Sequence, residues 1–195
     1  MQNKLYGLVL AGGESRRMGT DKGSILAGEK TWTAIAFEKL SKYCQKVCVS
    51  VNSSQEHIYS QKFGYENIIM DNIHIKGPLC GLLSAHKSFP DVDWVILACD
   101  MTDITPDLIS KIILEYEFQH LSQNIVFCIN NHVEPLLGIY KKEFLAVHLS
   151  LILNKKLENV SMKHFLETYP TQHILPEEKE YMNFKNYNAL QDLFG

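Results

Sequence analysis

Residues 4–22 have the sequence K-L-Y-G-L-V-L-A-G-G-E-S-R-R-M-G-T-D-K. The apolar run from Lys4 to Leu10 stops abruptly at Ala11-Gly12-Gly13, which predicts a buried strand that enters a tight turn. Glycines in this loop let the backbone adopt positive φ angles and present several N–H groups to one side. The loop also contains a compact basic cluster, formed by Arg16, Arg17 and Lys22. The stretch therefore predicts a phosphate-binding loop after the first strand.

The spacing within the loop excludes two common nucleotide-binding motifs. A Walker loop requires lysine directly after its second glycine, whereas Gly19 is followed by Thr20-Asp21. The loop also lacks the G-x-G-x-x-G pattern of dinucleotide-binding dehydrogenases. We expect Gly13 and Ser15 to donate to phosphate, and Arg17 and Lys22 to stabilise charge on a leaving pyrophosphate. An ordinary glycine-rich connection is the alternative.

Beyond the loop, predicted strands and helices alternate along the chain. Further strands are predicted at 46–51, 65–71, 94–100, 124–129 and 172–175, and a small hairpin-like excursion at 24–30. Helices are predicted at 31–43, 53–63, 77–89, 105–118, 141–154 and 161–168, with a last one from 189. This order predicts an α/β fold with a doubly wound, mostly parallel sheet and helices on both faces. The length of 195 residues fits a single domain over 1–195.

Polar residues stand where predicted strands end, and parallel sheets bind ligands beyond those ends. Asn52, Asp71 and Asp100 each occupy such a position. A carboxylate at the end of the buried strand 94–100 needs a compensating cation, so we expect Mg²⁺ at Asp100. Asp71 fits a solvated loop acid as well as a ligand, and Asp103 fits a favourable partner of a helix dipole.

Composition narrows the class of protein. The net charge of −3 and pI near 6.2 do not indicate a nucleic-acid binder. The apolar runs are shorter than the roughly 18 residues that suggest a membrane span. Five cysteines without a C-x-x-C pair favour reduced thiols, and the histidines show no zinc-ligand spacing. We therefore expect a cytoplasmic protein that binds neither nucleic acid nor membrane.

Four segments, in order along the chain, resemble motifs of the molybdenum cofactor guanylyltransferases, a family with the nucleotide-diphospho-sugar-transferase-like fold. The first loop is similar to L-A-G-G-x-S-x-R-M-G-x-D-K nearly residue for residue. The other three are G-P-L-C-G-L-L-S-A at 77–85, A-C-D-M-T-D-I at 98–104 and N-F-K-N-Y-N-A-L-Q-D-L at 183–193. The resemblance spans almost the whole chain and implies a nucleotidyltransferase.

The resemblance also implies roles for particular residues. It implies nucleotide contacts from Leu10, Ala11, Gly12, Lys22 and Asp71, and a magnesium site at Asp100. It places Asn186 and Asn188 near the pterin-bearing acceptor. A polar residue at the end of the second strand would face the nucleotide; Asn52 is one candidate and Ser50 the other.

The implied reaction is attack by the terminal phosphate of molybdopterin on the α-phosphorus of magnesium-bound GTP. Implied partners are apo-molybdoenzymes or a GTP-binding helper protein. Three departures from the family pattern concern the acceptor: Thr102 stands in place of proline, Ala189-Leu190 in place of Thr-Pro, and Glu134 precedes Pro135. The alternatives are a cytidylyltransferase, another nucleotidyltransferase with a different acceptor, and a non-catalytic nucleotide-binding chaperone.

Overall fold

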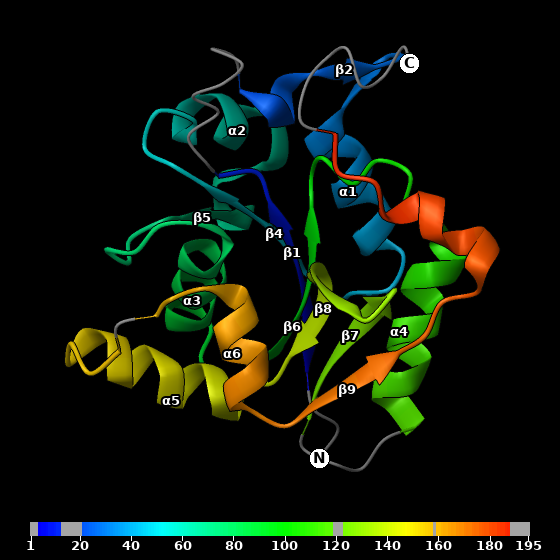
Figure 1. Ribbon diagram of the computed structural model, residues 1–195. Helices are drawn as coiled ribbons and strands as arrows, with labels where there is room; N and C mark the ends of the chain where they lie inside the picture. The colour runs from blue at the N-terminus through cyan, green and yellow to red at the C-terminus, as the bar shows by residue number, and fades with distance from the viewer. Residues whose placement is uncertain (1–3, 13–20, 119–122, 158, 188–195) are drawn as a thin grey trace.

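The computed structural model describes residues 4–12, 21–118, 123–157 and 159–187 (Figure 1). The strands are β1 (Leu5–Leu10), β2 (Leu26–Ala27), β3 (Lys30–Thr31), β4 (Val47–Val51), β5 (Ile68–Met70), β6 (Asp93–Ala98), β7 (Asn124–Ile129), β8 (His132–Tyr140) and β9 (Thr171–Ile174). The α-helices are α1 (Trp32–Ser41), α2 (Glu56–Phe63), α3 (Pro78–Ser88), α4 (Pro106–Phe118), α5 (Lys142–Leu153) and α6 (Met162–Thr168). Short 3₁₀ helices are η1 (Lys22–Ser24), η2 (Tyr65–Asn67) and η3 (Glu178–Phe184).

The main sheet has seven strands in the order β5-β4-β1-β6-β8-β7-β9, while β2 and β3 form a separate hairpin. The pairs β4–β5, β1–β4, β1–β6 and β7–β9 are parallel, and β8 is antiparallel to both its neighbours. The predicted doubly wound, mostly parallel sheet is therefore confirmed. The 24–30 excursion is also confirmed, as a hairpin that turns at Gly28 with a φ of 65°.

Strand β8 was not predicted from the sequence. Asn130 and Asn131 both have positive φ and connect β7 to β8 in a two-residue turn, because Ile129 pairs with His132. Asparagine tolerates this conformation, so the Asn-Asn pair was the available signal for a hairpin. Proline is disfavoured inside an interior strand, and Pro135 lies within β8. The register between β8 and β7 shifts between Val126 and Phe127, however, and proline is accommodated at such a bulge.

Two other differences concern the ends of elements. The strand predicted at 65–71 is shorter, since η2 occupies its first residues and only Ile68–Met70 pairs with β4. The helix predicted from 189 lies outside the described residues. The remaining elements begin and end within a few residues of their predicted bounds. Among the described residues, no helix combines the length and apolarity that crossing a membrane requires.

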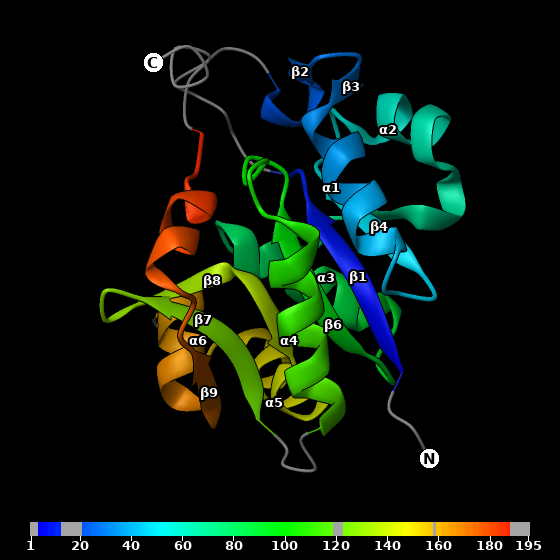
Figure 2. The same ribbon diagram turned by 90° about the vertical axis from the view of Figure 1, so that its right-hand side faces the viewer.

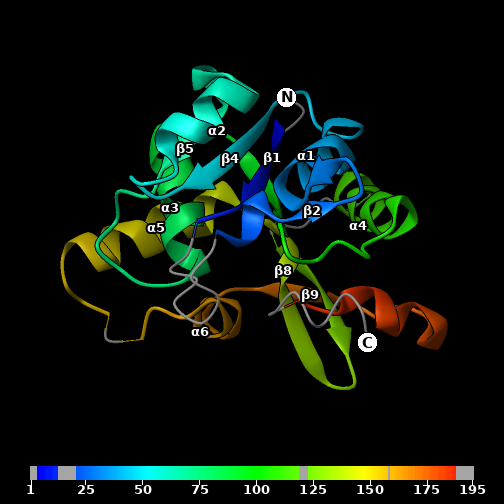
Figure 3. The same cartoon turned by 90° about the horizontal axis from the view of Figure 1, so that it is seen from above.

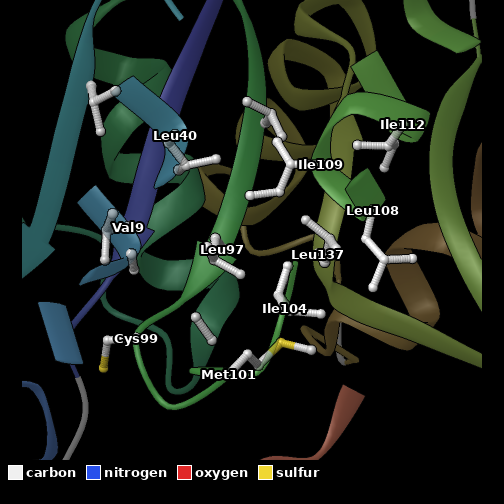
Figure 4. Close-up of a cluster of buried hydrophobic side chains, with 14 of the residues drawn as sticks. Val9, Leu40, Leu97, Cys99, Met101, Ile104, Leu108, Ile109, Ile112 and Leu137 are labelled. Carbon is white, nitrogen blue, oxygen red and sulfur yellow. The ribbon is translucent and has the colours of Figure 1, made fainter. Parts of the chain in front are cut away.

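Two hydrophobic cores lie on opposite faces of the sheet. Helices α1 and α4 cover one face, and α3, α5 and α6 cover the other (Figures 2 and 3). On the first face, Leu40 of α1 and Ile109 of α4 point toward Val9, Leu97 and Leu137 of the sheet (Figure 4). Both faces of β1 and β6 are therefore buried, which explains their continuous apolar sequences.

Candidate functional site

The carboxyl ends of three adjacent parallel strands meet at one edge of the sheet. Leu10, the last residue of β1, is paired with Ser50 of β4 on one side and with Ala98 of β6 on the other. The residues that follow these positions in sequence are therefore brought together, as expected for a parallel sheet. In open α/β sheets ligands bind beyond such strand ends, so this edge is the candidate ligand site.

Ser50, Asp71 and Gly12 form one side of this edge. The backbone N–H groups of Ala11 and Gly12 both donate to the carbonyl of Ser50, at 3.1 and 2.8 Å. The Ser50 hydroxyl donates to Asp71 Oδ1 at 2.6 Å. Burial raises the pKa of Asp71, and the hydrogen bond from Ser50 opposes that rise. A side-chain carbon at Gly12 would collide with Asp71 Oδ2, so only glycine allows this approach.

The geometry distinguishes the two candidates at the end of β4. Asn52 Oδ1 accepts hydrogen bonds from the backbone N–H and hydroxyl of Ser54, at 3.0 and 2.6 Å. These bonds occupy Asn52 in a local turn before α2. Ser50 is buried and bonded to Asp71, which makes Ser50 the residue that belongs to the strand-end cluster.

Gly81 of α3 lies against the ends of β1 and β4. A side-chain carbon at Gly81 would collide with the Ser50 hydroxyl and would lie 3.1 Å from Leu10 Cδ2. Packing of α3 against β1 and β4 therefore accounts for this glycine.

Lys22 and Asp100 form an ion pair at this edge, with Lys22 Nζ 3.2 Å from Asp100 Oδ2. Lys22 begins η1, and Asp100 follows β6 by two residues. The two side chains are 23% and 17% exposed, so both remain within reach of a ligand. The structure thus brings together the cation and the carboxylate that the sequence separates by 78 positions.

Asp21 anchors the end of the glycine-rich loop, a role that the sequence analysis missed. Its carboxylate accepts hydrogen bonds from Gly23 N at 3.0 Å, Gln55 Nε2 at 2.8 Å and Tyr59 Oη at 2.8 Å. Gln55 Nε2 also donates to the carbonyl of Ala11 at 3.1 Å. The buried Gln55 therefore connects the two ends of the loop. Because Lys22 follows Asp21 directly, these bonds also fix the backbone position of Lys22.

Asn186 lies beside Asp100, because the next residue, Tyr187, donates its backbone N–H to the Asp100 carbonyl at 3.1 Å. Asn186 Oδ1 is buried and has no hydrogen-bond partner within the described part of the chain. A buried acceptor without a donor costs free energy, so this amide oxygen indicates a place for a hydrogen-bonding ligand. Four other predicted site residues lie outside the described residues: Gly13, Ser15, Arg17 and Asn188.

Glu134 of β8 faces the same edge. One of its oxygens accepts the N–H of Leu136 at 2.8 Å, which satisfies a backbone donor within the bulge. Burial raises the pKa of Glu134; the Leu136 hydrogen bond opposes this rise, and the nearby charge of Asp100 adds to it. Glu134, one of the three departures from the family pattern, therefore places a second carboxyl group close to Asp100.

Asp100 is the metal ligand that the sequence predicts, and its surroundings limit how a metal could bind. Within the described ranges, no three His, Cys, Asp or Glu side chains are grouped so that they could hold a metal ion. A cation at Asp100 would consequently take most of its oxygen ligands from a substrate and from water. That arrangement is usual for Mg²⁺, which often binds through one or two carboxylates and phosphate oxygens.

The chain is similar to known proteins in sequence and in fold. The model of the MobA-like NTP transferase domain matches residues 7–171. The chain is 34% identical to a molybdenum cofactor biosynthesis bifunctional protein of Synechocystis sp. over 83% of its own length, and spans 44% of that protein. It is 29% identical to a probable molybdenum cofactor guanylyltransferase of Natranaerobius thermophilus, over 99% of the chain and 95% of the relative.

A similar fold occurs in the crystal structure of a molybdopterin-guanine dinucleotide biosynthesis protein A from Archaeoglobus fulgidus. The TM-score is 0.76 at 24% sequence identity, and the match covers 97% of this chain and 95% of that one. At this identity the likeness concerns the fold, and it agrees with the nucleotide-diphospho-sugar-transferase-like architecture expected from the sequence.

Proposed function

The chain belongs to the MobA-like NTP transferase family and is a nucleotidyltransferase; on that premise we propose that it transfers GMP from GTP to the terminal phosphate of molybdopterin. The observation that carries the proposal is the Lys22–Asp100 pair at the carboxyl ends of β1 and β6. The names of the curated relatives, such as the Natranaerobius protein, support guanylyl transfer in molybdenum cofactor biosynthesis.

The reaction is a substitution at the α-phosphorus of GTP. A terminal phosphate oxygen of molybdopterin forms a bond to this phosphorus, while the bond to the bridging oxygen of the β-phosphate breaks and pyrophosphate leaves. Negative charge moves onto the leaving group, so the protein contributes mainly positioning and cations. In our proposal Lys22 and Arg17 supply the cations, with Gly13 and Ser15 donating to phosphate oxygens.

The Asp100 carboxylate suits a magnesium ion that is shared with the triphosphate. Its oxygens are hard ligands at a partly exposed position, and no self-sufficient metal cluster exists among the described residues. When bound, Mg²⁺ would neutralise phosphate charge and orient the α-phosphorus. Lys22 would then exchange its bond to Asp100 for a bond to a phosphate oxygen.

Guanine and ribose are proposed to lie against Leu10, Ala11 and Gly12, with Asp71 at their side. The N–H groups of Ala11 and Gly12 already donate to Ser50, so these residues are proposed to contact the base through their carbonyl oxygens, as hydrogen-bond acceptors. Carbonyl oxygens accept from the N1–H and N2 amino groups of guanine. Because Ser50 is bonded to Asp71, we assign the strand-end position to Ser50 rather than Asn52.

The acceptor is proposed to bind on the other side of Asp100, at Asn186 and Asn188. The buried Oδ1 of Asn186, which has no hydrogen-bond partner among the described residues, supports this placement, because an acceptor that carries N–H groups would satisfy it. Pterin rings carry such groups. The attacking phosphate and the triphosphate would therefore approach Asp100 from opposite sides.

The decisive test measures pyrophosphate release with each of the four nucleoside triphosphates, with and without molybdopterin. We expect turnover only with GTP, magnesium and molybdopterin together. Lys22→Ala and Asp100→Ala should abolish turnover, whereas the matched control Lys30→Ala, which removes an exposed lysine paired with Glu38, should not. Turnover with CTP but not GTP would favour a cytidylyltransferase, and turnover unaffected by Lys22→Ala would refute the catalytic assignment.

A further inference from the structure

Residues 183–187 lie across residues 100–103, which belong to the loop between β6 and α4. We call residues 100–103 the 100–103 loop. Asn183 Nδ2 donates to the Asp103 carbonyl at 3.0 Å, and Tyr187 N donates to the Asp100 carbonyl at 3.1 Å. The Tyr187 hydroxyl also donates to the Asp103 carboxylate in a short hydrogen bond. Figure 1 shows η3 beside α4, and the residues that follow η3 running along the loop between β6 and α4. Two segments that are some eighty positions apart in sequence are thus bonded together at Asp100 and Asp103.

The 100–103 loop has Thr102 at the position where the family motif that this segment resembles has proline. Proline would restrict the backbone by fixing φ. Here Lys39 of α1 donates to the Thr102 carbonyl at 2.5 Å. Burial lowers the pKa of Lys39, and the negative charge of Asp103 opposes this effect. The loop is therefore restrained by side chains from outside it.

Tyr187 is well suited to restrain its neighbour Asn186. Its side chain is buried, with 9% of the residue exposed, and its ring packs against Trp32 with centroids 6.1 Å apart. Both its backbone N–H and its hydroxyl are bonded to the 100–103 loop. With Tyr187 fixed at two points, the backbone of Asn186 has little freedom relative to Asp100.

We propose that Tyr187 and Asp103 are positioning residues for the acceptor: their hydrogen bond sets Asn186 at a fixed place beside Asp100. This inference rests on the proposed function, because it assumes that Asn186 contacts the acceptor. It assigns Asp103 a different role from that of a helix-dipole partner of α4. The two roles differ in what they require, since a dipole partner needs a negative charge and a hydrogen-bond acceptor needs only an oxygen.

Four variants separate these roles. Tyr187→Phe and Asp103→Ala both remove the hydrogen bond, whereas Asp103→Asn keeps an oxygen that accepts from the Tyr187 hydroxyl. Asp107→Asn is the matched control, because Asp107 is an exposed acid in the first turn of α4. We expect the first two variants to raise KM for molybdopterin about tenfold, equivalent to about 1.4 kcal/mol, with KM for GTP within about twofold of wild type. In Asp103→Asn and Asp107→Asn, the KM values for both substrates should stay within about threefold of wild type.

The double variant Asp103→Ala/Tyr187→Phe tests whether the two residues act as a unit. Its KM for molybdopterin should be no higher than that of either single variant, because both remove the same bond. Three outcomes would overturn the inference while leaving guanylyl transfer by the wild type intact. The first is additive effects on KM for molybdopterin in the double variant, and the second is an unchanged KM in Tyr187→Phe. The third is an equal increase of KM in Asp103→Asn and Asp103→Ala.

Hydrogen exchange gives a measurement that needs no acceptor. The Tyr187 N–H, which is bonded to the Asp100 carbonyl, should exchange about tenfold faster in Tyr187→Phe than in wild type and at the wild-type rate in Asp107→Asn. An unchanged rate in Tyr187→Phe would refute the positioning role even if the wild type transferred no GMP to molybdopterin. If the wild type transferred no GMP to molybdopterin while exchange was still faster in Tyr187→Phe, the hydrogen bond would position Asn186 as inferred. The proposed acceptor, and with it the role of Asn186 in acceptor binding, would then be refuted.

Discussion

Replacing Ser50 by alanine should weaken GTP binding, whereas replacing Asn52 should not. The Ser50 hydroxyl donates to Asp71 Oδ1 at 2.6 Å in a buried setting. A hydrogen bond to a charged group contributes about 1.5–3 kcal/mol. If Asp71 must be oriented to contact the nucleotide, even the lower figure corresponds to an increase of about tenfold in KM for GTP.

The Ser50→Ala variant should also change the pH dependence of KM for GTP. Burial raises the pKa of Asp71, and the hydrogen bond from Ser50 counteracts that rise. Without the hydroxyl the pKa of Asp71 rises further, so less of the carboxylate is ionised at a given acidic pH. The increase of KM at low pH should therefore begin at a higher pH in the variant than in wild type.

The assay is the initial rate of pyrophosphate release at saturating molybdopterin, with GTP varied at several pH values. Asn52→Ala is the control: it removes the two hydrogen bonds to Ser54 and costs about 1 kcal/mol of stability, but leaves Asp71 unchanged. We expect KM for GTP within about twofold of wild type in this control. A larger increase in Asn52→Ala than in Ser50→Ala would refute the assignment of Ser50.

Three further predictions concern stability and packing. Lys141→Met should lower the free energy of unfolding by about 3–5 kcal/mol in urea titrations, because it leaves the fully buried Asp93 without its cation at 2.7 Å; a loss below about 1 kcal/mol would contradict this. Burial lowers the pKa of His148 from 6.5 to about 4, so the folded state binds fewer protons and thermal stability should fall as pH drops from 6.5 towards 4. His148→Leu should remove that part of the pH dependence of thermal stability. If the profile of melting temperature against pH were the same in His148→Leu and wild type, His148 would not be its source. Gly81→Ala should raise KM for GTP and lower the melting temperature, since its methyl group would collide with the Ser50 hydroxyl; unchanged values for both would show that α3 can shift.

The fold was largely predictable because its elements carry strong local signals. The first strand, the buried strand 94–100 and the proline-initiated helix after Thr105 each follow from hydrophobic pattern and capping chemistry. Strand β8 could not be predicted as readily, because Pro135 lies inside it and one of its two antiparallel partners, β6, is far away in sequence. The Asn-Asn turn before it was a usable local signal.

Less of the site was predictable. Strand-end acids such as Asp71 and Asp100 could be proposed because parallel strands end at one edge. The choice between Ser50 and Asn52 could not be made, because residues two positions apart share one face of a strand and the strand end was known only to within a few residues. The roles of Asp21, Gln55 and Tyr187 depend on hydrogen bonds between distant segments, which no local pattern reports.

The antiparallel strand β8 has a consequence for how such an enzyme can change its acceptor during evolution. It separates a parallel half-sheet, β5-β4-β1-β6, from β7 and β9, because β8 pairs with β6 on one side and with β7 on the other. In our proposal the nucleotide lies on the first half, while Glu134 and Asn186 border the second. Insertions or substitutions in the β7–β8 hairpin and after η3 could therefore alter the acceptor without disturbing nucleotide recognition. Acceptor diversity should accordingly accumulate in the last third of such chains, with Asp100 as the fixed boundary.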